Sequence, residues 1–308
     1  MTDSPYRSGF VSITGRPNVG KSTLLNTMLG QKISIVTSKP QTTRNRITGI
    51  KTLPGAQIVF IDSPGIHNPV SRYGDMMVRE AREAVSGVDI VLLVVNPVVP
   101  GPRDLEIIKF LGKAAKSVPV FLVVNKVDSV SKPKLLPVID EYSKAFEFAE
   151  VIPISALKGD GVELLLEKIA SRLPEGPMQY PDDMVTDRLE RFMVSEIIRE
   201  KVMELTEQEV PHSVAVDVVV WEESPAGHEG KGLDNPRGRV RIGADIWVER
   251  DSQKGIIIGK GGQRLKSIGT SARAEIEKLL DSRVHLDLWV KLKKDWRYDL
   301  KAIRELGI

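Results

Sequence analysis

Short, uniformly apolar runs alternate with amphipathic stretches through the first half of the chain. Apolar runs of strand length cover residues 9–14, 56–61, 89–95, 118–124 and 150–154, and a further strand-like stretch covers 47–52. Helical patterns lie between them, as over 22–29 and 104–115. Strands that are apolar along their whole length indicate a mostly parallel sheet that is buried on both faces. We therefore expect an α/β domain with a mostly parallel six-stranded sheet and helices on both faces.

The second half of the chain follows a different order of patterns. The elements predicted there are a helix from Thr186, its candidate cap, to about Glu207, strands over 213–221 and 237–248, two helices joined at 259–262, and a strand over 284–290. A loop rich in Gly, Pro and charge joins the two paired strands over 222–236. A terminal helix over 296–308 is expected to pack through Trp296, Leu300 and Ile303. The order α-β-β-α-α-β indicates a separate α+β domain.

A linker signal separates the two patterns. Three prolines and a glycine fall within residues 174–181, directly after the last helix expected in the first domain. We place the first domain at 1–175, the linker at 176–185 and the second domain at 186–308. A chain of 308 residues with 41% hydrophobic content is long enough to bury two cores.

Composition narrows the functional classes only slightly. Cysteine is absent, which excludes disulfides and thiolate metal sites. The N-terminus lacks the apolar core of a signal peptide, and the longest apolar run, 90–95, is too short to span a bilayer, so we expect a soluble cytoplasmic protein. Over 225–308, 18 Lys and Arg stand against 12 Asp and Glu, a net charge of +6. Such an excess indicates a nucleic-acid partner only when a binding motif accompanies it.

A phosphate-binding motif connects the first strand to the first helix. Residues 15–22 read GRPNVGKS and match G-x-x-x-x-G-K-[ST] between a strand and a helix, the setting that this motif requires. The glycines let the backbone curl around a di- or triphosphate, Lys21 places a charge at the β- and γ-phosphates, and Ser22 offers a hydroxyl to Mg²⁺. The residues expected to hold the nucleotide here are Gly15, Asn18, Val19, Gly20, Lys21, Ser22 and Thr23.

Two later segments have the order expected of a nucleotide switch. Polar residues over 39–44 predict a mobile loop, in which the second threonine, Thr43, would bind Mg²⁺ and sense the γ-phosphate. The strand over 56–61 ends in D-S-P-G, where Asp62 would hold Mg²⁺ through water and the Gly65 N–H would approach the γ-phosphate. The predicted metal site is therefore Ser22, Thr43 and Asp62, and the predicted catalytic residues include Lys21, Thr43 and Gly65.

The strands at 118–124 and 150–154 end in residues that select guanine. The Asp128 carboxylate can accept hydrogen bonds from the ring N1–H and from the 2-amino group of guanine, whereas adenine has neither donor there. The other residues expected around the base are Asn125 at N7, Lys126 over the ring, and the backbone of Ser155, Ala156 and Leu157 at O6. Since ligand loops gather at the carboxyl ends of parallel strands, these residues are predicted to share one site with the phosphate loop.

These motifs resemble the GTP-binding domain of the translation-factor-related GTPases over residues 8–173. Ile66 follows Gly65 at the place where many GTPases carry a glutamine that orients water, and with Asn18 and the T-T-R loop this resembles the Era/TrmE-like group. In some members of that group, an asparagine that matches Asn18 helps to hold K⁺. The resemblance therefore implies Asn18 as a catalytic residue, and K⁺ as a cofactor beside Mg²⁺ with GTP or GDP as ligand.

The second domain carries a motif for single-stranded RNA. Residues 256–269 read IIIGKGGQRLKSIG, which resembles a KH domain, and the element order matches the type II, bacterial form of that fold. The G-x-x-G turn has no bulky side chains, so an RNA backbone can approach it and about four nucleotides can be clamped. The expected RNA-binding residues are Ile258, Gly259, Lys260, Gly261, Gly262, Arg264 and Lys266.

A GTPase domain followed by a KH domain resembles the Era family over nearly the whole chain. The resemblance implies a GTP-hydrolysing switch that binds the 3′ end of small-subunit rRNA and acts in assembly of the small ribosomal subunit. It also implies peripheral contact with the cytoplasmic face of the inner membrane, although the sequence has no membrane-seeking segment, and we expect a monomer. Two alternatives stay open: an RNA-binding scaffold with vestigial nucleotide binding, which Ile66 motivates, and an ATP-using enzyme, which Asp128 disfavours.

Overall fold

The apolar runs of the first half form one sheet in the computed structural model, which describes residues 5–39, 42–65, 72–207, 210–224 and 238–306. Its strands lie in the order β2-β3-β1-β4-β5-β6. They are β1 Arg7–Thr14, β2 Ile47–Leu53, β3 Ala56–Asp62, β4 Ile90–Val95, β5 Val120–Val124 and β6 Glu150–Pro153. β2 is antiparallel to β3, and the other neighbouring pairs are parallel. The predicted six-stranded, mostly parallel sheet is confirmed.

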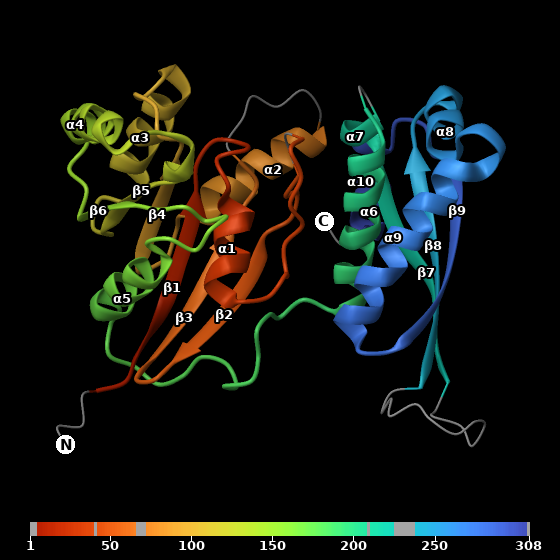
Figure 1. Ribbon diagram of the computed structural model, residues 1–308, viewed down its shortest axis with the longest axis horizontal. Helices are drawn as coiled ribbons and strands as arrows, with labels where there is room; N and C mark the ends of the chain where they lie inside the picture. Colours follow the sequence, from red (N-terminus) through yellow and green to blue (C-terminus); the bar gives the residue numbers. More distant parts are fainter. Residues whose placement is uncertain (1–4, 40–41, 66–71, 208–209, 225–237, 307–308) are drawn as a thin grey trace. The chain divides into compact units, whose positions relative to one another are not determined.

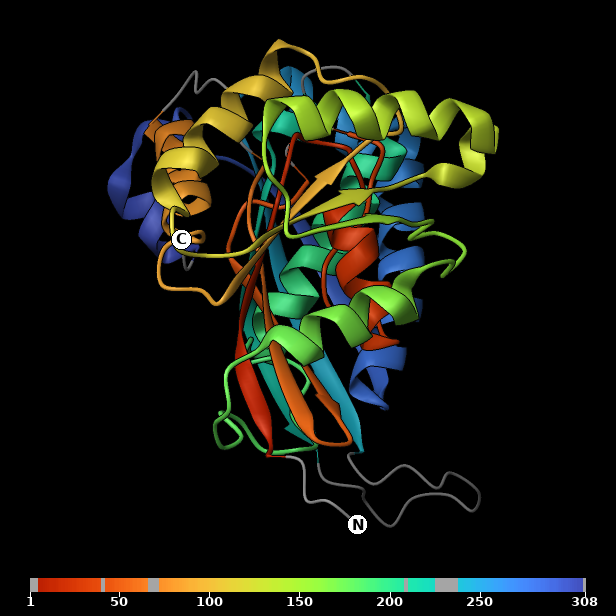
Figure 2. The same ribbon diagram turned by 90° about the vertical axis from the view of Figure 1, so that its left-hand side faces the viewer.

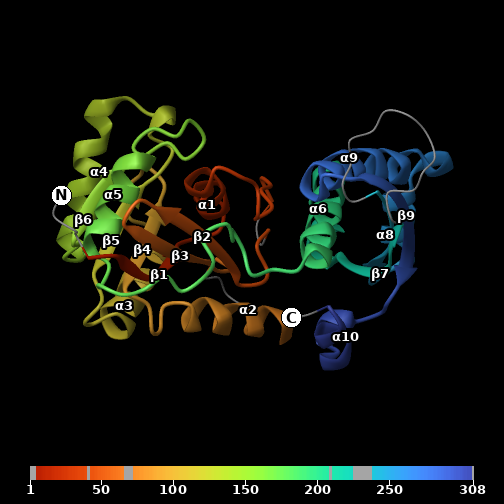
Figure 3. The same ribbon diagram turned by 90° about the horizontal axis from the view of Figure 1, so that it is seen from below.

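Helices cover both faces of this sheet, as its uniformly apolar strands require. They are α1 Lys21–Leu29, α2 Arg72–Glu83, α3 Pro102–Ala114, α4 Leu135–Ala145 and α5 Val162–Arg172. In Figures 2 and 3, α1 and α5 lie on one face and α2 and α3 on the other. The buried side chains of α3 and α4 join those of β4 and β5 in one hydrophobic cluster. The loops that follow the strands therefore extend from a sheet that is packed on both faces.

The second half forms a three-stranded sheet with helices against it (Figure 1). The elements are α6 Glu190–Leu205, α7 Val210–Ser213, β7 Ala215–Ser224, β8 Arg239–Val248, α8 Asp251–Ile258, α9 Gln263–Leu280, β9 Arg283–Leu292 and α10 Leu300–Glu305. β7 and β8 pair antiparallel, and β8 and β9 pair parallel. Side chains of α6, α8 and α9 pack with the sheet in one core. The predicted order α-β-β-α-α-β is confirmed, α10 lies within the predicted terminal helix, and α7 is a short addition.

The predicted start of α6 was wrong. Thr186 does not cap this helix, because its Oγ1 donates a hydrogen bond to the carbonyl oxygen of Thr48 at 2.7 Å and its neighbour Val185 accepts one from the N–H of Ile50 at 2.8 Å. This pairing keeps the chain extended beside β2, and the helix begins only at Glu190. A helix cap is predicted from neighbouring residues, whereas the contact between Thr186 and Thr48 joins residues far apart in sequence. The local pattern therefore could not predict it.

The predicted stripe of the terminal helix was only partly right. Trp296 and Ile303 are fully buried, but Leu300 is 48% exposed. Trp296 lies in a separate 3₁₀ turn, and α10 begins after it with Asp299 as its cap, so the helical spacing from Trp296 to Leu300 is broken. Of the loop predicted over 222–236, the first three residues belong to β7, and 225–236 lie outside the described residues.

The chain divides into an N-terminal unit, Met1–Val70 with Gly74–Asp187, and a C-terminal unit, Arg188–Ile308 with Ser71–Tyr73. The segment predicted as a linker is hydrogen-bonded to the N-terminal unit. The Gly176 N–H donates to the carbonyl oxygen of Tyr6 at 3.0 Å, and the Gln179 N–H donates to Gln57 Oε1 at 2.8 Å. The domain bounds at 175 and 186 stay a prediction.

Candidate functional site

A cavity of about 400 Å³ opens where β1 ends and α1 begins. Its lining comes from the phosphate loop, the start of α1, the segment before β2 and two strand-end loops. The lining residues are Pro17, Asn18, Gly20, Lys21, Ser22, Thr23, Ile35, Val36, Thr37, Ser38, Thr42, Thr43, Gly65 and Lys126. The structure thus brings together most of the predicted phosphate, metal and switch residues, which are spread over more than a hundred positions of sequence.

The phosphate loop is fixed from the side of the guanine motif. Gly20 has a φ of 96°, and a Cβ at this position would lie 2.4 Å from Asn125 Nδ2. That same Nδ2 donates a hydrogen bond to the carbonyl oxygen of Val19 at 2.8 Å, and Lys126 Nζ donates to the carbonyl oxygen of Asn18 at 2.6 Å. Only glycine fits position 20, because a side chain would displace Asn125 from this contact.

The buried ammonium group of Lys21 is suited to bind an anion in the pocket. Its side chain is buried, and its Nζ donates to the carbonyl oxygens of Gly15 at 3.3 Å and Arg16 at 3.0 Å. Burial lowers the pKa of Lys21 from 10.5 to about 8, and the nearby charge of Asp62 opposes this shift. A bound phosphate would oppose this effect of burial, because its negative charge favours the charged form of Lys21.

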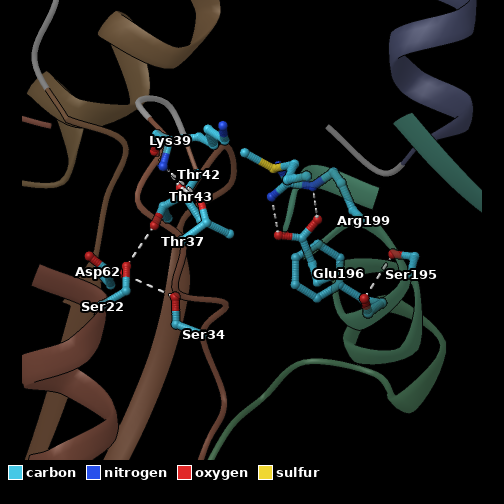
Figure 4. Close-up of polar contacts among 12 residues, drawn as sticks. Ser22, Ser34, Thr37, Lys39, Thr42, Thr43, Asp62, Ser195, Glu196 and Arg199 are labelled. Carbon is cyan, nitrogen blue, oxygen red and sulfur yellow. Dashed lines mark hydrogen bonds and ion pairs between the residues drawn. The ribbon is translucent and has the colours of Figure 1, made fainter. Parts of the chain in front are cut away.

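Ser22, Thr43 and Asp62 meet beside the pocket (Figure 4). The hydroxyl oxygens of Ser22 and Thr43 are 2.7 Å apart, and Ser22 Oγ donates to Asp62 Oδ2 at 2.8 Å. Burial raises the pKa of Asp62, while Lys21 and the hydroxyl donors oppose the rise. Among the described residues, the buried Asp62 Oδ1 has no hydrogen-bond partner. Two hydroxyls and a carboxylate with a spare oxygen suit a hard, oxygen-preferring cation such as Mg²⁺.

The guanine motif is ordered by its own hydrogen bonds. Asn125 Oδ1 accepts from the N–H of Lys126 at 2.7 Å and from the N–H of Ala156 at 2.9 Å. Ser155 Oγ donates to Asp128 Oδ1 at 2.6 Å, and this bond lowers the pKa of Asp128. The carboxylate is thus oriented and ionised. Leu157 is 81% exposed, and its predicted contact with the base is through its backbone N–H.

A second cavity, of about 450 Å³, lies between α9 and β9 in the C-terminal unit. We call it the α9 groove, and its lining residues are Gly262, Leu265, Lys266, Gly269, Thr270, Arg273, Leu286 and Leu288. Leucines form its apolar part, and Lys266 and Arg273 supply positive charge. Sequence reasoning found Gly262 and Lys266 but missed Arg273, although its spacing of seven from Lys266 is the signal for one face of a helix.

The G-x-x-G turn lies at one end of this groove, between α8 and α9. Gly261 has a φ of 57°, a backbone conformation that side chains disfavour, and a Cβ there would meet open space. Arg264 Nη1 donates to the carbonyl oxygen of Ile256 at 2.5 Å. The predicted phosphate contact of Arg264 therefore competes with a bond that closes the turn. Lys260, in contrast, is exposed, and its side chain makes no hydrogen bond or ion pair with any described residue.

The sequence analysis also missed two residues that contact the predicted nucleotide-binding residues. Ser34, from the segment before β2, donates to Asp62 Oδ2 at 3.2 Å, and no motif marks it. Thr27 Oγ1 donates to the carbonyl oxygen of Ala156 at 2.7 Å, which joins α1 to the loop after β6. The residue that raised doubt about water positioning, Ile66, lies outside the described residues.

Two known protein families match the chain, one in each half. The family described as 50S ribosome-binding GTPase matches residues 10–126, and the KH domain family matches residues 209–297. The chain is 53% identical to GTPase Era of Geobacter metallireducens over 308 residues, which are 100% of this chain and 99% of the relative. The chain belongs to the Era family of GTPases. GTPase Era of Clostridium acetobutylicum is 51% identical over 98% of each chain.

Two solved Era structures share this fold over 98% of the chain. Era in complex with MgGDPNP and nucleotides 1506–1542 of 16S ribosomal RNA is 42% identical, with a TM-score of 0.90, over 98% of this chain and 99% of that one. A variant of Aquifex aeolicus Era bound to GDP·AlF₄⁻ is 41% identical with the same TM-score and coverage. The present chain is thus a GTPase with a C-terminal KH domain. Within the described residues, no helix is long and apolar enough to cross a membrane.

Proposed function

We propose that this protein is a Mg²⁺-dependent, GTP-hydrolysing switch whose KH domain binds the 3′ end of small-subunit rRNA, and that it acts in assembly of the small ribosomal subunit. We assign the nucleotide to residues 1–175 and the RNA to residues 186–308. The observation that carries the proposal is the Ser22–Thr43–Asp62 cluster beside a phosphate loop that is hydrogen-bonded to the guanine motif. The 42% identical Era solved with MgGDPNP and 16S rRNA nucleotides supports both halves of it.

The pocket residues have distinct roles in this proposal. Mg²⁺ would be held by Ser22, Thr43 and, through water, Asp62, and it would supply charge neutralisation at the phosphates. The Lys21 ammonium stabilises charge on the γ-phosphate oxygens. The N–H of Gly65 senses the same group, and a Cβ at Gly65 would lie 2.9 Å from the Pro17 nitrogen, so a larger residue would displace this strand-end loop.

We also propose that Asn18 helps to hold K⁺ at this pocket. Asn18 lines the cavity with a φ of 62°, and its Nδ2 donates to the carbonyl oxygen of Ser38 at 3.1 Å. With the amide nitrogen used in this way, the side chain presents a carbonyl oxygen, the atom type that K⁺ prefers. GTP turnover should be faster in KCl than in NaCl, and Asn18→Ala should remove the difference. Equal turnover of the wild-type protein in the two salts would contradict this role.

The RNA half of the proposal rests on the G-x-x-G turn and the α9 groove. The open space around Gly261 admits an RNA backbone, and Lys260 and Lys266 carry the charge for its phosphates. Peripheral contact with the inner membrane and a monomeric state remain predictions from the resemblance. Vesicle flotation and sedimentation of the full chain would test them.

One experiment tests the function as a whole. RNA crosslinking and sequencing are performed with the full chain, ribosomal subunits and either GDP or a non-hydrolysable GTP analogue. We expect crosslinks at the 3′ end of the small-subunit rRNA, with a yield that differs between the two nucleotides. The same yield with both would contradict a switch, and crosslinks elsewhere would contradict the RNA target. Displacement of labelled GTP by an equal concentration of ATP would favour the ATP-using alternative.

A further inference from the structure

Asn26 ties the segment before β2 to the helix that follows the phosphate loop. Asn26 lies on α1, and its Oδ1 accepts hydrogen bonds from the N–H groups of Ile33 and Ser34, each at 3.0 Å. Its Nδ2 donates to the carbonyl oxygen of Ser34 at 2.7 Å. Of the common side chains, a short amide can both accept two such bonds and donate the third, because a carboxylate has no donor and a hydroxyl reaches less far.

Packing reinforces this attachment. Ile33 and Ile35 are 5% and 2% exposed, so the residues on both sides of Ser34 are anchored in the core. The chain reverses directly before them at Gly30, whose φ is 77° and whose N–H caps the end of α1. Residues 33–35 are therefore attached both by hydrogen bonds to α1 and by packing of Ile33 and Ile35 in the core. The lining of the pocket begins at the end of this attachment, with Ile35, and continues with Val36, Thr37 and Ser38.

Ser34 connects the attachment to the metal cluster (Figure 4). Ser34 is 1% exposed, and its Oγ donates to Asp62 Oδ2 at 3.2 Å, the same oxygen that accepts from Ser22 at 2.8 Å. Two hydroxyl donors on one oxygen fix the rotation of the carboxylate, and they leave Oδ1 as the oxygen without a partner among the described residues. The pocket-lining loop ends at Thr43, which contacts the same cluster through Ser22.

We propose that Asn26 and Ser34 are positioning residues of the GTP site. Asn26 holds the stationary end of the loop that carries Thr43, and Ser34 orients the Asp62 carboxylate so that Oδ1 stays available to the Mg²⁺ shell. Ser34 thus acts on Mg²⁺ through Asp62, and Asn26 acts through Ser34. The inference rests on the proposed function of the pocket, because it assigns these residues to the binding of Mg²⁺ with GTP.

The Ser34 variant tests the orientation of Asp62. Affinities of the full-length wild type, Ser34→Ala and the exposed control Gln31→Ala are measured for a non-hydrolysable GTP analogue, once with Mg²⁺ and once with EDTA. Loss of a hydrogen bond to a charged group should weaken binding of the analogue about tenfold in Mg²⁺. In EDTA, Ser34→Ala and the wild type should agree within about twofold, because without the ion the orientation of Asp62 has no bearing on binding. Equal losses with and without Mg²⁺, or no loss at all, would overturn the role of Ser34.

The Asn26 variant tests the stationary end of the loop. Hydrogen exchange in the nucleotide-free protein is compared for the wild type, Asn26→Ala and Ser34→Ala. The amides of Ile33 and Ser34 should exchange at least tenfold faster in Asn26→Ala, since their acceptor is gone, and remain protected in Ser34→Ala. Unchanged protection in Asn26→Ala would overturn the anchor. Failure of the wild type itself to bind the analogue would instead refute the proposed function, so the two failures are distinguishable.

Discussion

The nucleotide pocket and the α9 groove differ in how their polar groups are satisfied before any ligand is present. In the pocket, Lys21, Asp62 and Asn125 are buried and hydrogen-bonded to other parts of the same site. In the groove, the side chains of Lys266 and Arg273 make no hydrogen bond or ion pair with any described residue. A preorganised site loses much of its function when one member is removed, because the others are left unpaired. In the groove, removal of one charged side chain should cost only the contact that this side chain makes with the ligand.

The largest effect is expected at Lys21. Lys21→Ala removes the buried charge that faces the phosphates, and we expect single-turnover GTP hydrolysis to fall at least about a thousandfold. The matched control is Lys126→Ala, which removes a lysine that also lines the pocket but donates to a carbonyl at its rim. Its hydrolysis should fall less than about tenfold. Hydrolysis that survives Lys21→Ala would mean that the site described here is vestigial.

The parts of the pocket that could be predicted are those whose chemistry is written in local motifs. The phosphate loop, Asp62 and Asp128 each follow an apolar strand, and parallel strands bring their carboxyl ends to one edge. Ser34 could not be predicted, since a serine outside any motif becomes a donor to Asp62 only through the fold. Threonine is a residue type that commonly caps helices, but Thr186 instead hydrogen-bonds to Thr48 in β2, and this contact decides its conformation.

The groove shows the same limit for charged residues. Arg264 and Arg273 carry the same charge, and the hydrogen-bond partners of their side chains cannot be inferred from the sequence. The bond from Arg264 to the carbonyl oxygen of Ile256 depends on the turn geometry, in which Gly259 and Gly261 both have positive φ. The motif therefore predicts where RNA would bind, whereas the structure is needed to see that Arg264 already has a partner within the turn.

A substitution in the turn should produce the second largest effect. Gly261→Asp adds a side chain at a φ of 57° and a negative charge where an RNA phosphate would approach. We expect RNA affinity to fall about a hundredfold, because strain and repulsion act together, with GTP affinity unchanged. Gly255→Asp, at a glycine of α8 that also faces open space but lies outside the turn, is the control. Wild-type RNA affinity in Gly261→Asp would remove the turn from the RNA site.

Substitutions of Arg264 and Arg273, both on α9, should differ in their effect on the salt dependence of RNA binding. Arg273→Ala should weaken RNA binding about fivefold and reduce the slope of log affinity against log salt by about one, as loss of one phosphate contact does. Arg264→Ala should leave the slope unchanged and instead lower the melting temperature, because its guanidinium is used within the turn. Binding titrations at several salt concentrations measure the first effect, and thermal unfolding measures the second. The opposite assignment of slope and stability would show that Arg264 is the RNA contact.

The smallest predicted effect is a proton taken up by the pocket. The pKa of Lys21 is about 8 in the protein without nucleotide, and bound phosphates favour the charged form and raise it. Above this pKa, binding must therefore add a proton to Lys21, and affinity for GDP should fall as pH rises, with no such effect well below it. Calorimetry at about pH 8.5 in two buffers of different ionisation enthalpy should show uptake of about half a proton or more. Lys126→Ala should retain this uptake, and identical enthalpies in the two buffers for the wild type would mean that Lys21 is already charged in the empty pocket.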